Sequence, residues 1–521
     1  MKFRALALLL VAPAASHAQA PVDAPPAEPP PAAAATITGR EIGGRLRFLA
    51  SDAMRGREAG STEARIAAEY LASHLSALGA EPLGDAGRSG RSFLQKFPLE
   101  FVTPTAEGSE LTLTLTPGGS KRVVSCKLGT DYIYSPWGVV PGEVEADVAF
   151  AGYGRHDPES GVNDYAGVDV RGRFALVYQG EPAAEDGKAD APRRGHGDPA
   201  AKMKAAKEMG ALGLLIIPAP GDAGEPRPPG PPSLFGFDRS RATLGAAPTA
   251  IPSIALTPAI RDLIEPARDQ GLRVRFAHAA RREARDDHNV AGYFPGSDPQ
   301  KKNEIVVFSA HYDHEGVDAK GDIYNGSDDN ASGTSGLMEI AEAFASAPRP
   351  ARSVAFLWVS GEEKGLLGSK WFADHQPLPE GAKIVADINL DMISRNDPSK
   401  IGATPSPSHP DYNSLVADAA EATRAEGLEM LFDSDPYYGR TDSYNFAAKG
   451  VPVIFFFAGL HDDYHKPTDD FEKADVEKAA RVARAAFRLG WKAAQASEPP
   501  KKIAAPAPAA ETAPAESGAS S

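Results

Sequence analysis

The sequence predicts an α/β fold with a mostly parallel central sheet flanked by helices, together with an inserted, smaller α/β unit. Two observations carry this prediction. After Asp286, short apolar runs alternate with helical patterns, which is typical of strands buried on both faces of a parallel sheet. Between about residues 143 and 275, short strands mix with a single helix, and we interpret this region as the smaller unit.

The first folded segment is expected to begin with a helix. Its apolar residues recur at spacings of three and four and stop before Gly79; they are Ile66, Tyr70, Leu71, Leu75 and Leu78. Leu and Thr then alternate from Leu111 to Leu115, which predicts a half-buried strand.

The inserted unit is predicted to contain strands at 174–178 and 214–217 and a helix near 200–209. From Gly221 to Pro232, eight of the twelve residues are Gly or Pro, which predicts a surface loop.

The main sheet is predicted from four apolar runs, at 305–310, 354–359, 384–390 and 453–458. Helical patterns lie between them, for example at 337–344 and 415–425.

Composition excludes several classes of function. The 521 residues carry a formal net charge of 55 − 70 = −15, which argues against nucleic acid as a partner and against anionic membrane surfaces. Cys126 is the single cysteine, so an internal disulfide and a cysteine-based zinc site are excluded. We interpret Cys126 as a buried structural thiol.

The N-terminus has the pattern of a secretory signal. Lys2 and Arg4 precede a short apolar stretch that ends in small residues at Ala18-Gln19-Ala20. This stretch is too short to span a membrane, and no later run reaches 18 apolar residues. We therefore expect an exported protein without a membrane span, located in the periplasm or outside the cell.

Chemically active side chains follow all four predicted strands of the main sheet. The strand ends lead into His311-Tyr312-Asp313-His314, Glu362-Glu363, Asp391 and His461 to Pro467, and an acidic turn runs from Gly326 to Gly333. Functional groups in open α/β sheets gather beyond the carboxyl ends of the strands. Carboxylates that converge there repel one another unless a cation holds them.

These residue types indicate a metal site. Two histidines and at least three carboxylates, without cysteine, suit zinc, with cobalt or manganese as substitutes. The number of carboxylates suits two ions that share a bridging carboxylate better than one ion. An acidic cluster of solvated loops is the alternative interpretation.

The same residues resemble the signature of metallopeptidase family 28, the co-catalytic zinc aminopeptidases and their glutamate carboxypeptidase relatives. The similarity covers about 200 residues from His288 to Trp491. Residues 37 to about 105 resemble the N-terminal piece of that family, through Leu49 to Asp52 and Gly56-Arg57. The middle region resembles an inserted protease-associated domain, through Lys204 to Ala206 and Gly210 to Ile216. The implied fold is that of the zinc aminopeptidases.

Composition and the resemblance together predict a domain order along the chain. Composition predicts a signal peptide (1–20), an extended, unpacked Pro/Ala linker (21–36) and a disordered tail (497–521). The resemblance implies the N-terminal part of the peptidase domain (37–105), a protease-associated insert (106–285) and the catalytic di-zinc domain (286–496).

The resemblance also implies a role for each site residue. His311 and Asp391 are expected to bind one zinc, His465 and Glu363 the other, and Asp328 to bridge the two ions. Glu362 is implied to be the general base that deprotonates the attacking water, with Asp313 behind His311 to fix its tautomer. Tyr464 resembles a tyrosine that hydrogen-bonds the substrate oxyanion.

One departure from the family affects the substrate-binding region. Thr441-Asp442-Ser443 stands where many members have Ser-Asp-His, which affects substrate contacts there, including those of Arg440. Tyr437 and Tyr438 are expected either to line a specificity pocket or to pack.

Two further histidines, His314 and His461, lie near the ligands but match no ligand position. We interpret them as loop histidines satisfied by their neighbours, or as histidines that contact the ligands without binding metal.

The leading hypothesis is a secreted di-zinc aminopeptidase that acts on peptides. A carboxypeptidase or dipeptidase of the same family is disfavoured because no arginine cluster flanks the ligands. A single-zinc glutaminyl cyclase is disfavoured because no ligand of the second metal is missing. A non-catalytic receptor-like member is the alternative from another class. Residue preference, oligomeric state and the role of the insert stay open.

Overall fold

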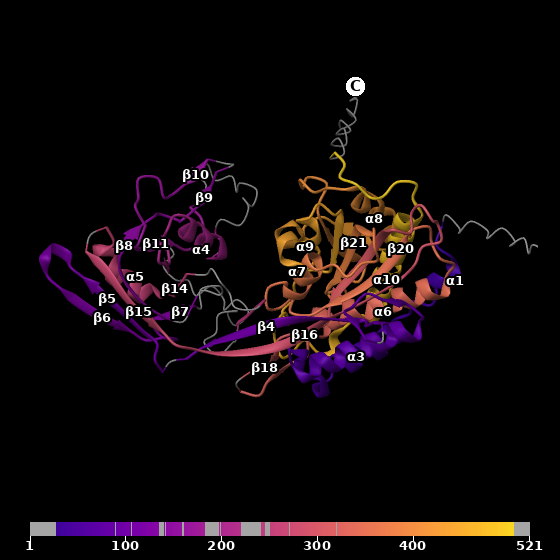
Figure 1. Ribbon diagram of the computed structural model, residues 1–521, viewed down its shortest axis with the longest axis horizontal. Helices are drawn as coiled ribbons and strands as arrows, with labels where there is room; N and C mark the ends of the chain where they lie inside the picture. The colour runs from indigo at the N-terminus through magenta and orange to yellow at the C-terminus, as the bar shows by residue number, and fades with distance from the viewer. Residues whose placement is uncertain are drawn as a thin grey trace, which may run out of the picture.

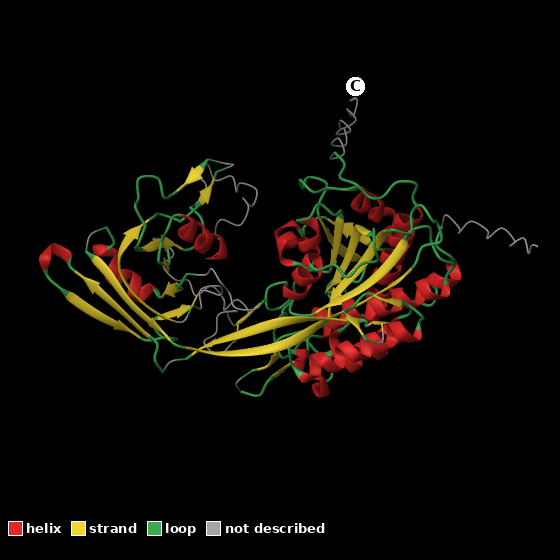
Figure 2. Ribbon diagram, in the orientation of Figure 1, coloured by secondary structure: helices red, strands yellow, loops and turns green. Residues whose placement is uncertain are grey.

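A computed structural model of the protein describes residues 28–504, except for 89, 106, 135–139, 141, 159–160, 183–196, 198, 220–240, 245–250, 270 and 319. The described residues form two units, each built around its own large sheet (Figures 1 and 2). The predicted signal peptide and the predicted loop at 221–232 lie outside the described residues.

The larger unit contains a mixed ten-stranded sheet. In spatial order its strands are β13 (Arg241–Thr243), β4 (Leu94–Pro104), β16 (Ala280–Phe294), β20 (Ser353–Val359), β17 (Glu304–His311), β21 (Lys383–Asp391), β24 (Val453–Phe457), β22 (Lys400–Thr404) and β23 (Glu429–Leu431), with β1 (Glu81–Pro82) paired to β16. The four central strands, β20, β17, β21 and β24, run parallel to one another. They are the four apolar runs of the sequence, so the predicted α/β fold with a central sheet is confirmed. The flanking pairs β4–β16, β16–β20 and β22–β24 are antiparallel, which makes the sheet mixed.

Helices cover both faces of this sheet (Figure 2). One face packs against α2 (Gly39–Leu49), α3 (Thr62–Ala77), α6 (Gly333–Ser346), α8 (Ser414–Ala425) and α10 (Val476–Gln495). The other face packs against α7 (Leu367–Asp374) and α9 (Ser443–Ala447). Because side chains alternate along a strand, β17 contributes Val306 and Phe308 to the first core and Ile305 and Val307 to the second.

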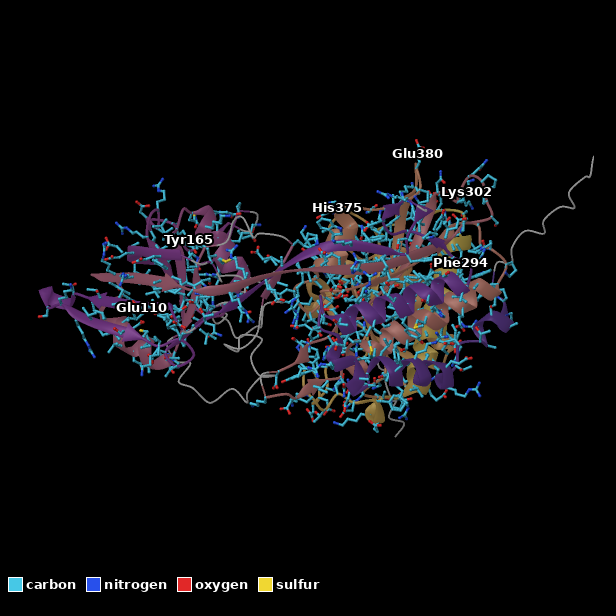
Figure 3. The ribbon with its side chains drawn as sticks, turned by 60° about the horizontal axis from the view of Figure 1, so that its bottom comes forward. Glu110, Tyr165, Phe294, Lys302, His375 and Glu380 are labelled. Carbon is cyan, nitrogen blue, oxygen red and sulfur yellow. The ribbon has the colours of Figure 1, made fainter. Side chains whose placement is uncertain are left out.

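The smaller unit contains an eight-stranded sheet with its own core. In spatial order its strands are β6 (Arg122–Cys126), β5 (Glu110–Leu115), β15 (Leu272–His278), β8 (Gly142–Phe150), β11 (Phe174–Tyr178), β12 (Gly213–Ile217), β14 (Ser253–Leu256) and β7 (Tyr132–Tyr134). Its helices are α4 (Pro199–Glu208) and α5 (Pro258–Ile264). Figure 3 shows Glu110 and Tyr165 in this unit and Phe294 and Lys302 in the larger one.

A long antiparallel ribbon joins the two sheets (Figure 1). β4 and β16 pair from Pro104 opposite Ala280 to Leu94 opposite Val290. The predicted boundary at 285/286 therefore falls inside β16, whose first half is polar and carries no apolar run. The resemblance of the insert to a protease-associated domain stays a prediction.

Two terminal segments differ from their predicted disorder. Within the predicted linker, α1 (Pro31–Ala34) is a helical turn whose Ala33 and Ala34 are buried in the main core. In the predicted tail, Lys501 exchanges backbone and side-chain hydrogen bonds with Ser414. Local alanine and proline content predicted an extended chain in both places, but tertiary packing orders these residues. Residues 505–521 lie outside the described part of the chain.

The remaining elements are short. The hairpins are β2 (Ala86–Gly87) with β3 (Gly90–Arg91), β9 (His156–Asp157) with β10 (Val162–Asn163), and β18 (Gly316–Val317) with β19 (Ile323–Tyr324). Single helical turns lie at Asp52–Arg57, Pro117–Gly119, Glu265–Ala267, Ser327–Ser332, Asp435–Arg440 and Phe471–Lys473.

Candidate metal centre

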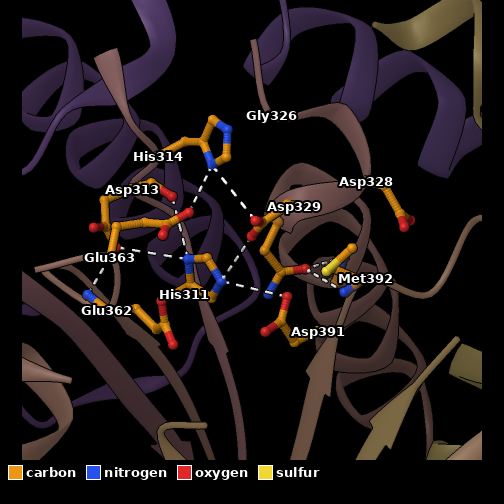
Figure 4. A network of polar contacts seen from close by, with 12 residues as sticks. His311, Asp313, His314, Gly326, Asp328, Asp329, Glu362, Glu363, Asp391 and Met392 are labelled. Carbon is orange, nitrogen blue, oxygen red and sulfur yellow. Dashed lines mark hydrogen bonds and ion pairs between the residues drawn. The ribbon is translucent and has the colours of Figure 1, made fainter. Parts of the chain in front are cut away.

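The predicted ligands meet at the carboxyl ends of the four parallel strands. His311 is the last residue of β17 and Asp391 the last of β21, while Glu363 follows β20 and His465 follows β24. Since these strands are neighbours in the sheet, their ends place the four side chains at one edge. Figure 4 labels three of them, His311, Glu363 and Asp391. The turn Ser327–Ser332, which leads into α6, closes the group from the side.

Asp329 lies between the two histidines. His311 Nε2 is 3.3 Å from Asp329 Oδ1 and 3.3 Å from Asp391 Oδ1. His465 Nε2 is 3.1 Å from Asp329 Oδ2 and 3.1 Å from Glu363 Oε2. Each histidine thus faces one terminal carboxylate and one oxygen of the shared Asp329. This is the arrangement expected for two cations joined by a bridging carboxylate.

The expectation that Asp328 provides the bridge is wrong. Its carboxylate is directed away from the histidine pair (Figure 4), and its Oδ1 accepts hydrogen bonds from the backbone N–H and the hydroxyl of Ser394, both at 2.7 Å. Asp328 and Asp329 are adjacent in a tight turn, so only one of them is directed at the cluster. Spacing along the sequence does not distinguish the two, because both lie in the same acidic turn.

The turn that presents Asp329 is fixed by hydrogen bonds from outside it. Asp469 Oδ2 accepts the backbone N–H groups of Asp328 at 3.0 Å and Asp329 at 3.2 Å. Asn330 donates to the carbonyl of Leu390 at 3.0 Å and accepts the N–H of Met392 at 3.2 Å. The turn is therefore tied to the loop that follows Asp391.

Asp313 lies beside His311, as predicted, but the closer contact is to its backbone. His311 Nδ1 is 3.2 Å from the Asp313 carbonyl oxygen and 3.7 Å from the carboxylate. Since a carbonyl only accepts, Nδ1 carries a proton, and Nε2 is the ring atom that faces Asp329 and Asp391. Burial lowers the pKa of His311, but the carboxylates of Asp391 and Glu362 raise it by more, so the pKa lies well above its ordinary value and Nε2 holds a second proton when no metal is bound.

Two further contacts surround the second histidine, and of these only that of Glu315 was not predicted. His314 Nδ1 lies 2.8 Å from Glu363 Oε1, so this loop histidine contacts a predicted ligand. Glu315 Oε1 lies 3.6 Å from His465 Nδ1, and Glu315 is paired with Lys364 at 3.3 Å. Both residues directly follow His311-Tyr312-Asp313, and that adjacency is the signal that would have identified Glu315.

A buried arginine holds the loops of the centre from behind. Arg57 is fully buried and donates to the carbonyls of Tyr312 at 2.8 Å, Asn325 at 2.8 Å and Gly326 at 3.0 Å, and also to that of Leu49. Its guanidinium thus connects the N-terminal segment to both loops that carry ligands.

The predicted catalytic residues line one cavity beside the cluster. Its walls are Asp329, Glu362, Glu363, Asp391, Met392, Tyr437, Arg440, Phe455, Phe457, Leu460 and Tyr464. Burial raises the pKa of Glu362 well above its ordinary value, and the carboxylates of Glu363, Asp442 and Asp391 add to this. The Tyr464 ring stacks on His465 with 3.9 Å between ring centroids.

The two neighbouring tyrosines, Tyr437 and Tyr438, differ in their position relative to the cavity. The Arg440 guanidinium lies 5.4 Å from the centroid of the Tyr437 ring, and both residues line the cavity. Tyr438 is instead buried in the core and donates to Asp411 at 2.9 Å. Thr441 donates to Asn389 at 3.0 Å under the sheet edge.

The residues present fit a pair of divalent cations. The Nε2 atoms of His311 and His465 and Oδ1 of Asp391 are buried and have no hydrogen-bond partner among the described residues. A ring nitrogen that faces carboxylate oxygens needs a cation between them, and a metal ion can take the place that a proton holds in the metal-free protein. Imidazole and carboxylate are the ligands that zinc accepts in a site without cysteine.

Known proteins resemble this part of the chain. Residues 289–489 match the family model described as Peptidase family M28. Leupeptin-inactivating enzyme 1 of Streptomyces exfoliatus is 30% identical over 188 residues, which are 36% of this chain and 39% of the relative. Aminopeptidase YwaD of Bacillus subtilis (strain 168) is 27% identical over 213 residues, 39% of this chain and 44% of the relative. The match thus spans less than half the length of either relative.

Solved structures share the fold over most of the chain. An aminopeptidase from Aneurinibacillus sp. strain AM-1 has a TM-score of 0.58 at 22% identity and covers 89% of this chain and 96% of its own. BSAP, a zinc aminopeptidase from Bacillus subtilis, has a TM-score of 0.50 at 19% identity over 88% of this chain and 96% of its own. At these identities the likeness concerns the fold alone.

Proposed function

We propose that the chain, whose residues 289–489 match the model of peptidase family M28, is a zinc-dependent aminopeptidase of that family that removes single residues from peptide N-termini. The observation that carries this proposal is the carboxylate of Asp329, shared between His311 and His465. Each of these histidines also faces a second carboxylate, that of Asp391 or Glu363.

Two zinc ions are the proposed cofactor. One would be held by His311, Asp391 and one oxygen of Asp329, and the other by His465, Glu363 and the second oxygen of Asp329. When bound, such ions polarise a carbonyl group and lower the pKa of a water molecule to about 7. Asp313 fixes the tautomer of His311 through its carbonyl, which leaves Nε2 free to bind.

Glu362 is the proposed general base. Its carboxylate lines the cavity next to Asp391 and Glu363, and no ion pair of Glu362 with a cationic side chain occurs among the described residues. A raised pKa allows Glu362 to take a proton from the attacking water at Oε and to return it to the leaving amine. Glu363, its neighbour in sequence, is held by His314 and His465 and is not available for this role.

Tyr464 is the proposed donor to the substrate oxyanion. It lines the cavity, and its ring is stacked on His465. This stacking restricts the orientation of the ring and therefore the position of the hydroxyl. Burial raises the pKa of Tyr464 well above its ordinary value, and this keeps the hydroxyl protonated and able to donate.

The described wall of the cavity lacks the cluster of arginines that would favour a free carboxylate. With zinc bound, the carboxylates of Asp329, Glu363 and Asp391 would be compensated by the ions. Among the described residues of the wall, Arg440 is the one cationic side chain. Recognition of a terminal carboxylate favours paired or clustered arginines, so this wall supports an aminopeptidase over a carboxypeptidase.

Export is a further part of the proposal, and it is supported by the signal-like N-terminus. Among the described residues, no helix combines the length and the apolar character that crossing a membrane requires.

The substitution Glu362→Gln tests the catalytic assignment. It removes the base but keeps the shape of the side chain, so we expect kcat to fall by about 100- to 10,000-fold while zinc stays bound. Zinc is measured by elemental analysis and turnover with an unblocked peptide. Turnover at the level of the natural protein would contradict the role of Glu362.

A further inference from the structure

Asp328 connects two loops behind the metal centre. Its Oδ1 accepts both hydrogen bonds from Ser394, in the loop after β21, and its Oδ2 lies 3.3 Å from His461 Nε2. His461 begins the segment 461–469, here called the His465 loop, which carries Tyr464 and His465. Asp328 is fully buried, and the His461 side chain is 3% exposed.

The nitrogen of His461 that lies near this carboxylate is the one that carries a proton. Nδ1 of His461 accepts the backbone N–H of Asp463 at 3.2 Å, so Nε2 bears the N–H. Asp328 Oδ2 and His461 Nε2 have no hydrogen-bond partner among the described residues and lie 3.3 Å apart, which makes each the nearest candidate partner of the other.

Further contacts connect the same loops. Asp469, at the end of the His465 loop, accepts the backbone N–H groups of Asp328 and Asp329. Arg395, next to Ser394, pairs with Asp463 at 2.7 Å. The turn with Asp329, the loop after Asp391 and the His465 loop are thus joined by charged groups that touch neither His311 nor Glu363.

We propose that the contact between Asp328 and His461 is a positioning device, which holds the His465 loop against the Asp329 turn before any metal binds. The device sets the distance between His465 and Asp329 and thereby the affinity of one of the two cation positions. This inference rests on the proposed function for its purpose, but its claim concerns the metal-free protein.

The direction in which loss of this contact changes metal affinity can be predicted. Without a partner at His461, Asp328 Oδ2 is a buried carboxylate oxygen with no donor, and the loop gains freedom to leave it. Groups that orient metal ligands without touching the metal typically change metal affinity by about 10- to 100-fold when removed. The effect should fall on the position that uses His465 and spare the one that uses His311 and Asp391.

Three variants of the full-length protein test the proposal. His461→Leu removes the donor, whereas His461→Gln retains an N–H donor at nearly the same reach. His409→Leu is the matched control, because His409 Nδ1 also accepts the N–H two residues ahead, that of Asp411 at 3.1 Å. In this control, the same kind of local hydrogen bond is lost, but at a histidine on a different loop.

The first readout is hydrogen exchange in the metal-free proteins. We expect the amides of the His465 loop to exchange at least about 10-fold faster in His461→Leu and to stay near the natural rate in His461→Gln and His409→Leu. The amides of β17 report on the fold and should not change in any variant.

The second readout is zinc affinity, measured by competition with a chelator. His461→Leu should release one zinc about 10- to 100-fold more readily and keep the other, while the two remaining variants bind as the natural protein does. Unchanged exchange and unchanged affinity in His461→Leu would overturn the proposal. Equal losses in His461→Gln would overturn it too, since packing of the ring would then be responsible. Neither readout uses a peptide. If the natural protein bound zinc but cleaved no peptide, the proposed aminopeptidase activity would be refuted, while these two readouts would still test the role of His461.

Discussion

Asp329 is the residue on which the metal centre depends, because one carboxylate contacts both histidines. Its two oxygens lie 3.3 Å from His311 and 3.1 Å from His465. Asp329 is almost completely buried, so its charge is compensated by its immediate neighbours and not by bulk water.

The substitution Asp329→Asn tests the shared carboxylate. An amide offers one oxygen in place of two and carries no charge, so we expect at least one of the two zinc ions to be lost after dialysis. Zinc per chain is measured by elemental analysis. Asp387→Asn, at a buried aspartate of β21, is the control and should retain both ions. Two ions retained in Asp329→Asn would contradict a bridging role.

Asp387 allows a pH test that does not involve the metal centre. It is fully buried, accepts the hydroxyl of Ser309 at 2.9 Å, and burial raises its pKa to about 8. The folded state holds the proton of Asp387 more tightly than the unfolded chain does. The contribution of this group to the stability of the folded state is therefore fully present below about pH 4. That contribution is lost as the pH rises through about 8.

Asp387→Asn removes this dependence, because an amide does not titrate. We expect the Tm of Asp387→Asn minus the Tm of the natural protein to become more positive from pH 5 to pH 9. Thermal melts at pH 5, 7 and 9 measure it. A constant difference across this range would contradict the raised pKa, because it would show that Asp387 is already ionised in the folded protein at pH 5.

At the scale of elements, the contact between α10 and β17 holds the first core under the metal centre. Gly490 of α10 lies against Phe308 of β17, and a Cβ at position 490 would come within 2.0 Å of the Phe308 ring. The absence of a side chain at 490 therefore sets the distance between helix and sheet.

Two alanine substitutions in helices test this packing. Gly490→Ala forces the ring or the helix to move and should lower the free energy of unfolding by about 1–3 kcal/mol. Gly44→Ala in α2 is the control, because a Cβ there meets no atom within 4 Å. It should raise the free energy of unfolding by about 0.5–1 kcal/mol through helix propensity. Denaturant titrations of both variants measure these changes, and equal effects would contradict the packing argument.

The central strands could be predicted from sequence because they are buried on both faces. β17, β20, β21 and β24 each coincide with a mostly apolar run, and the site residues at their ends followed from that placement. β16 could not be found in this way, since its first half pairs with β4 in an exposed ribbon and is polar. The choice between Asp328 and Asp329 depends on which direction each side chain takes in a tight turn, which spacing does not encode.

At the scale of the whole molecule, the two units have separate cores. The core of the smaller unit contains residues from 111 to 276, and no residue of the larger sheet shares it. The groups of side chains that could hold a metal, among the described residues, all lie in the larger unit.

Metal removal should therefore affect one unit only. Ligands that bind the folded state stabilise it by mass action, by about 2.7 kcal/mol at a concentration 100 times the Kd. We expect two transitions in calorimetry, of which a chelator lowers one and leaves the other unchanged. A single transition, or an equal shift of both, would contradict independent units.

Mass spectrometry of peptide products tests the account most directly. One peptide is offered with a free N-terminus, an acetylated N-terminus or an amidated C-terminus, each with and without a chelator. The account predicts stepwise loss of residues from the free N-terminus, whether or not the C-terminus is amidated, and no loss from the acetylated peptide or in the presence of chelator. Loss of residues from the C-terminus, cleavage of the acetylated peptide, or no cleavage by the zinc-loaded protein would contradict it.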